Sequence, residues 1–134
     1  MVSCVPIVCG MADDLRCWQN GLIFKELNMI YNMRVYDLKP GSVPEYMKAV
    51  KEVALKIRED QGIKLAGWYY TDVGPQHRIV HIWAYRDYAH FEKARAAVHD
   101  DPRWANDYLP RVRGLAVKQQ DMMMKGADFF PGPQ

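Results

Sequence analysis

Residues 64–86 read KLAGWYYTDVGPQHRIVHIWAYR, and this stretch gives the strongest indication of the fold. Its two ends, residues 64–73 and 78–86, are rich in aromatic and β-branched residues, which favour β-strands. Between them lies Gly74-Pro75-Gln76-His77, a short segment with the residue types of a turn. The pattern therefore predicts two antiparallel strands joined as a hairpin.

The register of this hairpin follows if Val73 faces Arg78. Trp68 then pairs with Trp83, so that one face of the hairpin is aromatic and polar while the other is small and aliphatic. Small side chains suit close packing under helices, so we expect the helices to cover the aliphatic face and to leave the aromatic face open. The aromatic face also carries Tyr70, His81 and Tyr85.

A strand and a helix are predicted before the hairpin. Residues 29–38 are rich in β-branched, aromatic and methionine residues and end at the turn Lys39-Pro40-Gly41. Ser42 and Glu45 have the spacing of a capping box, in which each side chain bonds a backbone N–H of the other residue. Apolar residues then recur every three or four positions as far as Asp60, which predicts one amphipathic helix.

A second helix and a fourth strand are predicted after the hairpin. Asp87 is the predicted N-cap of this helix, which restarts at Asp101 and should end or kink at Pro110 because proline has no backbone N–H. The fourth strand is predicted over residues 115–124. The order βαββαβ is that of a ferredoxin-like α+β fold, with a four-stranded antiparallel sheet and both helices on one of its faces.

The aromatic face of the sheet also predicts a homodimer. The first strand adds Arg34 and Tyr36 to this face. A buried aromatic side chain covers about 150–250 Å², and monomers rarely expose apolar patches beyond a few hundred Å². A second copy of the sheet is the simplest cover, and two sheets packed face to face would enclose a partly polar cavity.

The chain of 134 residues has the length of one domain. Residues 29–126 contain all the predicted elements. Residues 1–28 hold all three cysteines and show no clear periodicity, so we interpret them as an N-terminal extension. Three alternatives stay open for it: a weakly ordered arm, a segment placed before the true start at Met29, or a targeting peptide. Residues 127–134 have no period and are predicted to form a flexible C-terminal tail.

Composition argues against several classes of function. A net charge of +2 without runs of Lys or Arg argues against a nucleic-acid partner, and no apolar stretch reaches the ~18 residues of a membrane span. Three cysteines and four scattered histidines make no disulfide framework and no metal-ligand spacing, and the chain has no cofactor motif, so we expect neither metal nor cofactor. Cysteines confined to the first 17 residues favour a reducing compartment such as the cytoplasm.

Three segments resemble the NIPSNAP family: MIYNMRVYDLKPGSVPEY (29–46), LAGWYYTDVGP (65–75) and HIWAYRDYAHFEKARA (81–96). The resemblance covers residues 29–124 and implies the dimeric α+β barrel fold, which small monooxygenases and stress-response proteins share. It implies no particular reaction, because the family has none generally assigned, and its eukaryotic members imply a mitochondrial alternative for the location. Asn32 departs from the acidic residue usual at its position, and residues 1–28 have no counterpart in the shared domain.

Candidate site residues are predicted on the aromatic face. His81 could act as a general base or bind a ligand anion, or it could be a hydrogen-bonded interface histidine. Arg34 could hold a carboxylate or form an ion pair with an acid such as Asp72. The predicted pocket favours a small anionic or aromatic ligand and consists of Arg34, Tyr36, Trp68, Tyr70, His81, Trp83 and Tyr85.

Three functional hypotheses remain open on these grounds. The first is a NIPSNAP family protein of unassigned activity that binds a small organic ligand or a partner through its dimer. The second is a cofactor-independent monooxygenase or isomerase acting in the same cavity, and the third is an interaction module without chemistry. The second hypothesis requires a titrating group such as His81 within reach of an enclosed space.

Overall fold

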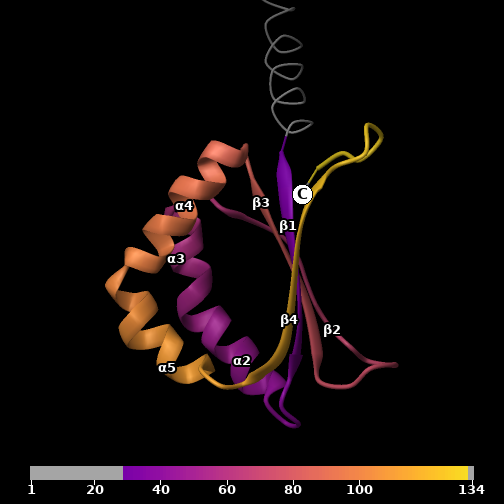
Figure 1. Ribbon diagram of the computed structural model, residues 1–134, viewed down its shortest axis with the longest axis vertical. Helices are drawn as coiled ribbons and strands as arrows, with labels where there is room; N and C mark the ends of the chain where they lie inside the picture. The colour runs from indigo at the N-terminus through magenta and orange to yellow at the C-terminus, as the bar shows by residue number, and fades with distance from the viewer. Residues whose placement is uncertain (1–28, 133–134) are drawn as a thin grey trace, which may run out of the picture.

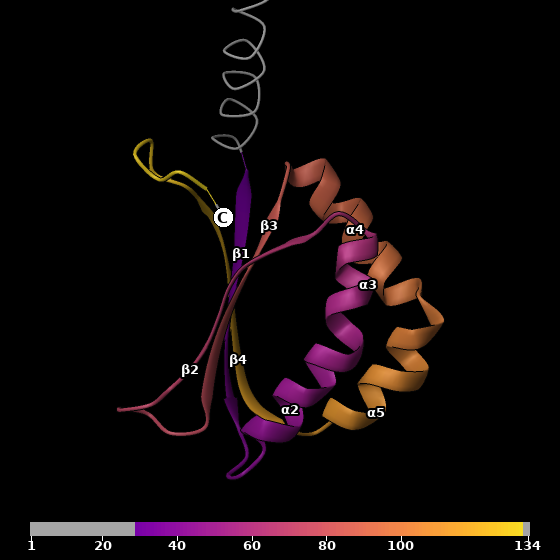
Figure 2. The same cartoon turned by 180° about the vertical axis from the view of Figure 1, so that it is seen from behind.

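The computed structural model describes residues 29–132, so the predictions for residues 1–28 lie outside the described part of the chain. These residues form one antiparallel sheet of four strands in the order β2-β3-β1-β4. Figures 1 and 2 show the helices together on one face of that sheet. The strands are β1 Ile30–Leu38, β2 Lys64–Tyr70, β3 Arg78–Tyr85 and β4 Ala116–Lys125. The predicted ferredoxin-like α+β fold is confirmed.

The helical layer consists of two long segments, each interrupted by a π-helical stretch. The first runs through α2 Val43–Ala49, η1 Val50–Ala54 and α3 Leu55–Asp60. The second runs through α4 Tyr88–Asp100, breaks at Asp101, whose backbone is extended (φ −66°, ψ 126°) and where a restart was predicted, and continues through η2 Trp104–Tyr108 and α5 Leu109–Val112. The wider π turn of η2 ends two residues before Pro110, whose ring and missing N–H disturb a regular α-helix, and the helix ends two residues after the proline. Within residues 29–132, no helix is long and apolar enough to cross a membrane.

The two predicted helix caps have different outcomes. Asp87 caps α4 as predicted, because its side chain accepts a hydrogen bond of 2.7 Å from the backbone N–H of His90. The prediction of a capping box at Ser42 was wrong, because the Ser42 side chain makes no cap hydrogen bond. Its backbone is already helical (φ −85°, ψ −12°), whereas a capping residue has an extended backbone that turns its side chain toward the free N–H groups.

This difference gives a direct test of the two caps. Asp87→Ala is expected to lower the free energy of unfolding by about 1 kcal/mol, because it leaves the N–H of His90 without its acceptor. Ser42→Ala is the matched control and is expected to change the free energy of unfolding by less than about 0.5 kcal/mol. Urea unfolding of both variants measures the difference; equal losses would contradict the assignment.

The predicted hairpin register was wrong by two residues. Trp68 pairs with His81 rather than with Trp83, and Tyr70 pairs with Ile79 rather than with His81. The strand β2 ends at Tyr70 instead of residue 73, so the connection runs from residue 71 to 77. A longer loop changes the register because the loop length sets which residues of a hairpin face each other.

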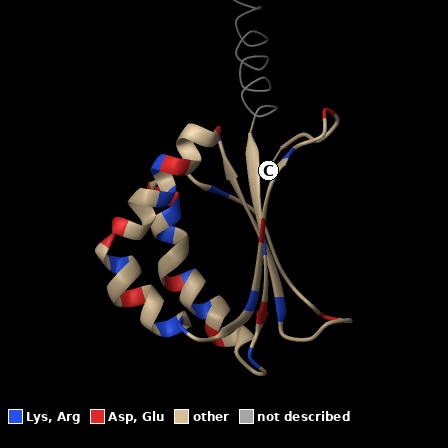
Figure 3. Ribbon diagram, in the orientation of Figure 1, with Lys and Arg blue, Asp and Glu red and all other residues tan. Residues whose placement is uncertain are grey.

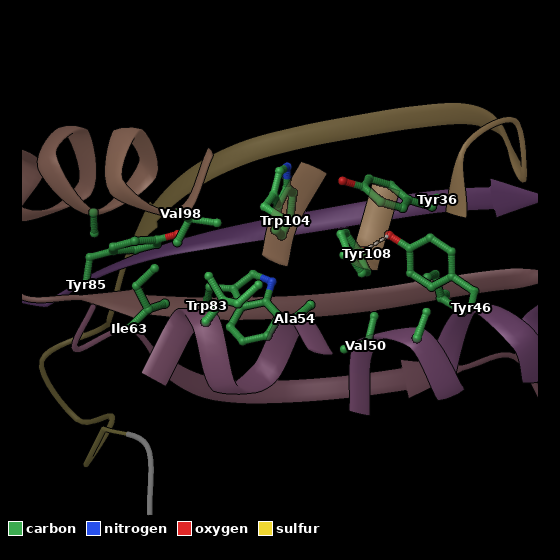
Figure 4. Close-up of a cluster of buried hydrophobic side chains, with 14 of the residues drawn as sticks. Tyr36, Tyr46, Val50, Ala54, Ile63, Trp83, Tyr85, Val98, Trp104 and Tyr108 are labelled. Atoms are coloured by element: carbon green, nitrogen blue, oxygen red, sulfur yellow. Dashed lines mark hydrogen bonds between the residues drawn. The ribbon is translucent and has the colours of Figure 1, made fainter. Parts of the chain in front are cut away.

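The faces of the sheet are also the reverse of the prediction. The helices cover the aromatic face: the Trp83 side chain is 2% exposed, Tyr36 contacts Tyr46 of α2, and Tyr85 contacts Phe91 of α4. Figure 4 shows Tyr36, Trp83 and Tyr85 between the strands and the helices. Several inward positions of the helices are small, and the bulky side chains of the sheet fill the space that they leave. The small inward residues are Ala49, Ala54 and Ala94.

The face of the sheet that carries no helix, called here the helix-free face, is mainly aliphatic. Its buried cluster consists of Met29, Tyr31 and Ala84, with Ala66, Ile82 and Met124 packed against it. Phe130 from the predicted tail lies edge-on against Tyr31, with ring centroids 5.9 Å apart. The predicted open aromatic patch therefore does not exist, and a homodimer needs another argument.

Candidate functional site

A cavity of about 260 Å³ lies between the sheet and the helical layer. Aromatic rings and arginines dominate its walls, and no Asp or Glu side chain contributes to them. A smaller cavity of about 100 Å³ adjoins it and shares Arg34, Arg58 and His99 with it. The main cavity is lined by Arg34, Tyr36, Tyr46, Val50, Ala54, Arg58, Trp68, His81, Trp83, His99, Trp104, Tyr108, Leu109, Val112, Arg113, Gly114, Ala116 and Gln119.

The structure brings together five of the seven residues predicted for the pocket. Tyr85 lines the smaller cavity instead, and the Tyr70 side chain is 60% exposed at the end of β2 and lines neither. The five that line the main cavity are Arg34, Tyr36, Trp68, His81 and Trp83. Their location corrects the prediction, because they lie under the helices and not between two sheets. Their role in binding stays a prediction.

Arg58 is the most unusual group of the site, and the sequence analysis missed it. The whole residue is only 8% exposed, and it lines both cavities. Among residues 29–132 it has no carboxylate partner, and the hydrogen bond that its Nη1 donates to the hydroxyl of Tyr85 is long, at 3.5 Å. Its guanidinium lies 4.3 Å from the ring of Trp83 and 5.6 Å from that of Trp104. Burial lowers the pKa of Arg58, because the charged form loses its hydration.

Arg34 differs from Arg58 in having an acidic neighbour. Its Nε lies 3.3 Å from Oδ2 of Asp121 on β4, and Asp121 also accepts a hydrogen bond from the side-chain amide of Asn32. The guanidinium of Arg34 further lies 5.5 Å from the ring of Tyr36. Asp121 therefore offsets part of the charge of Arg34, while Arg58 keeps its full charge.

His81 is held as a neutral imidazole. Its Nδ1 accepts a hydrogen bond of 2.6 Å from the indole N–H of Trp83, so the ring proton lies on Nε2. Burial, together with the positive charges of Arg34 and Arg58, lowers the pKa of His81 to about 3. The ring stacks on Trp68 at 4.5 Å. His81 is therefore placed to donate a hydrogen bond rather than to take up a proton.

Three tyrosines form the end of the cavity nearest α2 and α5. The hydroxyl of Tyr108 donates to that of Tyr46 at 3.2 Å, and Figure 4 shows the two hydroxyls directed toward each other. Burial raises the pKa of Tyr36, of Tyr46 and of Tyr108. All three stay protonated at neutral pH, so they offer hydroxyl groups but no negative charge.

Charge outside the site is mixed. Figure 3 shows Lys and Arg interspersed with Asp and Glu along both helical segments. Within the described residues, no group of three or more His, Cys, Asp or Glu side chains could hold a metal ion. The positive charge of Arg34 and Arg58 inside the cavity is thus a local feature of the site.

Comparison with known proteins then identifies the family. The NIPSNAP family model matches residues 31–131. The chain belongs to the NIPSNAP family. A NIPSNAP family protein of unknown function from Agrobacterium tumefaciens has 35% sequence identity and a TM-score of 0.72, over 78% of this chain and 94% of that one. A NIPSNAP-like domain protein from Burkholderia xenovorans has 28% identity and a TM-score of 0.73, over 81% and 93% of the two chains.

Curated NIPSNAP relatives are longer proteins. This NIPSNAP chain is 28% identical over 92 residues to the NipSnap homolog 3A of Pongo abelii. The aligned residues make up 69% of this chain but 37% of the relative. It is 32% identical over 75 residues to the human NipSnap homolog 2, covering 56% of the chain and 26% of the relative. The chain therefore spans about a third of the length of these relatives, and their activities are not transferred to it.

The fold itself is shared more widely. A protein from Nitrosomonas europaea, described as a candidate antibiotic biosynthesis monooxygenase, has a TM-score of 0.59 at 14% identity and covers 78% of this NIPSNAP chain and 94% of its own. Similarity at that level of identity establishes the fold alone. The predicted membership of the NIPSNAP family, with no assigned activity, is confirmed.

Proposed function

We propose that this NIPSNAP domain binds a small organic anion in the cavity under the helices, with Arg58 as its principal counter-charge. The observation that carries the proposal is the buried guanidinium of Arg58, which lines both cavities without a carboxylate partner among residues 29–132. Burying a charge without a partner costs several kcal/mol. A bound carboxylate would offset that cost and could engage the guanidinium through two parallel hydrogen bonds.

The surroundings of Arg58 support an anion over a cation or a neutral ligand. Arg34 adds a second positive charge to the same walls, and Arg113 adds a third where the cavity is lined by exposed residues. The lining of the main cavity contains no acidic side chain that would repel an anion, and the one acid that lines the smaller cavity, Asp121, is paired with Arg34. The aromatic rings offer an apolar surface for the body of the ligand.

The same geometry disfavours the enzymatic alternative. A cofactor-independent monooxygenase or isomerase would need a base in the cavity, and His81 was the candidate. The Nδ1 of His81 is occupied by Trp83, and burial, together with the positive charges of Arg34 and Arg58, opposes its protonation. We therefore favour binding over proton abstraction by His81.

Calorimetric titration with benzoate, benzyl alcohol and benzylamine tests this proposal. The three probes have one ring of the same size and differ in charge. Benzoate is expected to bind with a Kd between about 10 μM and 1 mM, which suits a ligand of so few atoms, and the other two are expected to bind at least tenfold more weakly. Equal binding of all three, or no binding of benzoate, would contradict the proposal.

A homodimer remains part of the proposed function, now through the helix-free face. Its support is the aliphatic character of that face, where Ile82 is half-buried and Met122 is 47% exposed. Sedimentation velocity at micromolar concentration is expected to give twice the mass of the chain, and Ile82→Lys is expected to give a monomer. Tyr88→Lys, which places the same charge on the exposed surface of α4, is the control and should leave the dimer intact. A monomeric wild-type protein would contradict the proposal.

The compartment is also still a proposal. Cysteine usage supports the cytoplasm. The family resemblance supports the mitochondrion as the alternative if the protein is eukaryotic.

A further inference from the structure

The main cavity is surrounded by buried donors that have no acceptor. Among residues 29–132, four buried side-chain polar atoms lack a hydrogen-bond partner, and all belong to residues that line this cavity. Each is an N–H donor, since the neutral His81 carries its proton on Nε2. The Nε of Arg34 is close enough to Asp121 for an ion pair but is not aligned for a hydrogen bond. The other three are Trp68 Nε1, His81 Nε2 and Trp104 Nε1.

Unpartnered buried donors are uncommon because they lose their hydrogen bonds to water on folding. His81 is 3% exposed and Trp104 is 7% exposed, so more than nine-tenths of the surface of each residue is buried. A set made only of donors matches a ligand that carries only acceptors. This requirement is independent of the charge of Arg58.

Trp83 sets the spacing between the cation and two of these donors. Its ring contacts the guanidinium of Arg58 at 4.3 Å, and its indole N–H bonds His81 at 2.6 Å. Trp68 stacks on His81, with centroids 4.5 Å apart and planes inclined by 25°. Arg58 thus lies over the ring face of Trp83 and the Trp68–His81 pair lies at its N–H edge, so a single indole separates them, a span that one aromatic ring and its substituents can bridge.

We infer that the ligand is an aromatic carboxylate with an uncharged hydrogen-bond acceptor at the opposite end of its ring. The carboxylate binds Arg58, and the acceptor takes the hydrogen bonds of His81 Nε2 and Trp68 Nε1. This inference rests on the proposed function, because it presumes that an anion binds at Arg58. It adds the polarity of the far end and the length of the ligand.

The far end accepts an uncharged group in preference to a second anion. The rings that contact His81 there are uncharged: Trp68 from β2, Tyr36 from β1 and Trp83 from its own strand. Neutral donors compensate the desolvation of a ketone or ester oxygen, but they compensate that of a carboxylate much less. Two positive charges act on His81: that of Arg34, its cross-strand partner, which Asp121 partly offsets, and that of Arg58, which the first carboxylate engages.

A pair of shape-matched probes tests the inference on the wild-type chain. 4-Acetylbenzoate carries an acceptor opposite its carboxylate, and 4-isopropylbenzoate has nearly the same shape without one. By calorimetry, 4-acetylbenzoate is expected to bind about tenfold more tightly, because two buried donors gain a partner. Equal affinities, or tighter binding of the isopropyl compound, would overturn the inference while leaving binding at Arg58 intact. If neither compound binds while benzoate does, the inferred length of the ligand is wrong; if benzoate does not bind either, the proposed function fails as well.

Two single substitutions then locate the donor. Trp68→Phe keeps a ring to stack on His81 but removes one N–H, and it is expected to reduce the preference for 4-acetylbenzoate at least threefold. Tyr70→Phe removes a hydroxyl from the same strand, outside both cavities, and is expected to leave the preference unchanged. An unchanged preference in Trp68→Phe would overturn the placement of the acceptor. The wild-type comparison stands even if that variant does not fold.

Discussion

Arg58→Met is expected to remove anion binding and, at the same time, to make the protein more stable. Methionine fills the space of the arginine stem without a charge, so the variant no longer desolvates a guanidinium that lacks a carboxylate partner among the described residues. The contacts of Arg58 with Trp83 and Trp104 are lost, which offsets part of the gain. We expect a net increase in the free energy of unfolding of about 1 kcal/mol or more, measured by urea denaturation.

Benzoate affinity should fall at least about thirtyfold in the same variant, since a hydrogen-bonded charge pair contributes about 2 kcal/mol. The combination of higher stability and lost binding distinguishes a functional arginine from a structural one. Arg78→Met is the control, because Arg78 forms its ion pair with Asp37 and lines neither cavity. It should leave binding unchanged and cost at most about 1 kcal/mol. A less stable Arg58→Met protein that still binds benzoate would contradict the proposed function.

The positions of helices and strands were predictable because their signals are local. β1 was predicted over residues 29–38 and runs from Ile30 to Leu38, and β4 was predicted over 115–124 and runs from Ala116 to Lys125. Turn residues and side-chain periodicity mark the first and last residues of each helix or strand to within a few positions. The Asp87 cap was predictable for the same reason.

The choice of face was not local, and the prediction failed there. Alternation shows that Trp68, His81 and Trp83 share a face, but it does not show which face the helices cover. That outcome depends on how side chains from distant elements fill a common volume. Ala54 of the first helical segment, for example, leaves room for the indole of Trp83, as Figure 4 shows.

Arg58 was not predicted as a site residue because its neighbours in the sequence are charged. It stands in the segment KIRED, whose charges are typical of a solvated helix surface. One signal was present: Val50, Ala54 and Arg58 are spaced by four residues, which places the arginine on the buried stripe of the helix. A charged residue in phase with an apolar stripe therefore merits attention as a candidate site residue.

The stability of the protein should depend steeply on pH because of His81. The folded pKa of His81 is lowered to about 3, whereas an unfolded histidine titrates near 6.5. Below pH ~6.5 the unfolded chain takes up a proton that the folded protein does not bind, so this contribution to stability is complete above pH ~6.5 and is lost as the pH falls toward 3. Each unit by which the pH falls within that window lowers the free energy of unfolding by about 1.4 kcal/mol, because unfolding takes up one proton.

His81→Asn isolates this effect, because an asparagine oxygen can still accept the N–H of Trp83 but does not titrate. Between pH 6.5 and 4.5 the wild-type protein is expected to lose about 2–3 kcal/mol more than the variant in urea unfolding experiments. Carboxylates that titrate at lower pH, such as Asp37 and Asp60, contribute equally to both proteins and cancel in the difference. His77→Asn is the control: His77 lies in the hairpin connection with φ +60°, which asparagine tolerates, and this variant should follow the wild-type curve. Parallel curves for wild type and His81→Asn between pH 6.5 and 4.5 would show that His81 is not held neutral by the fold.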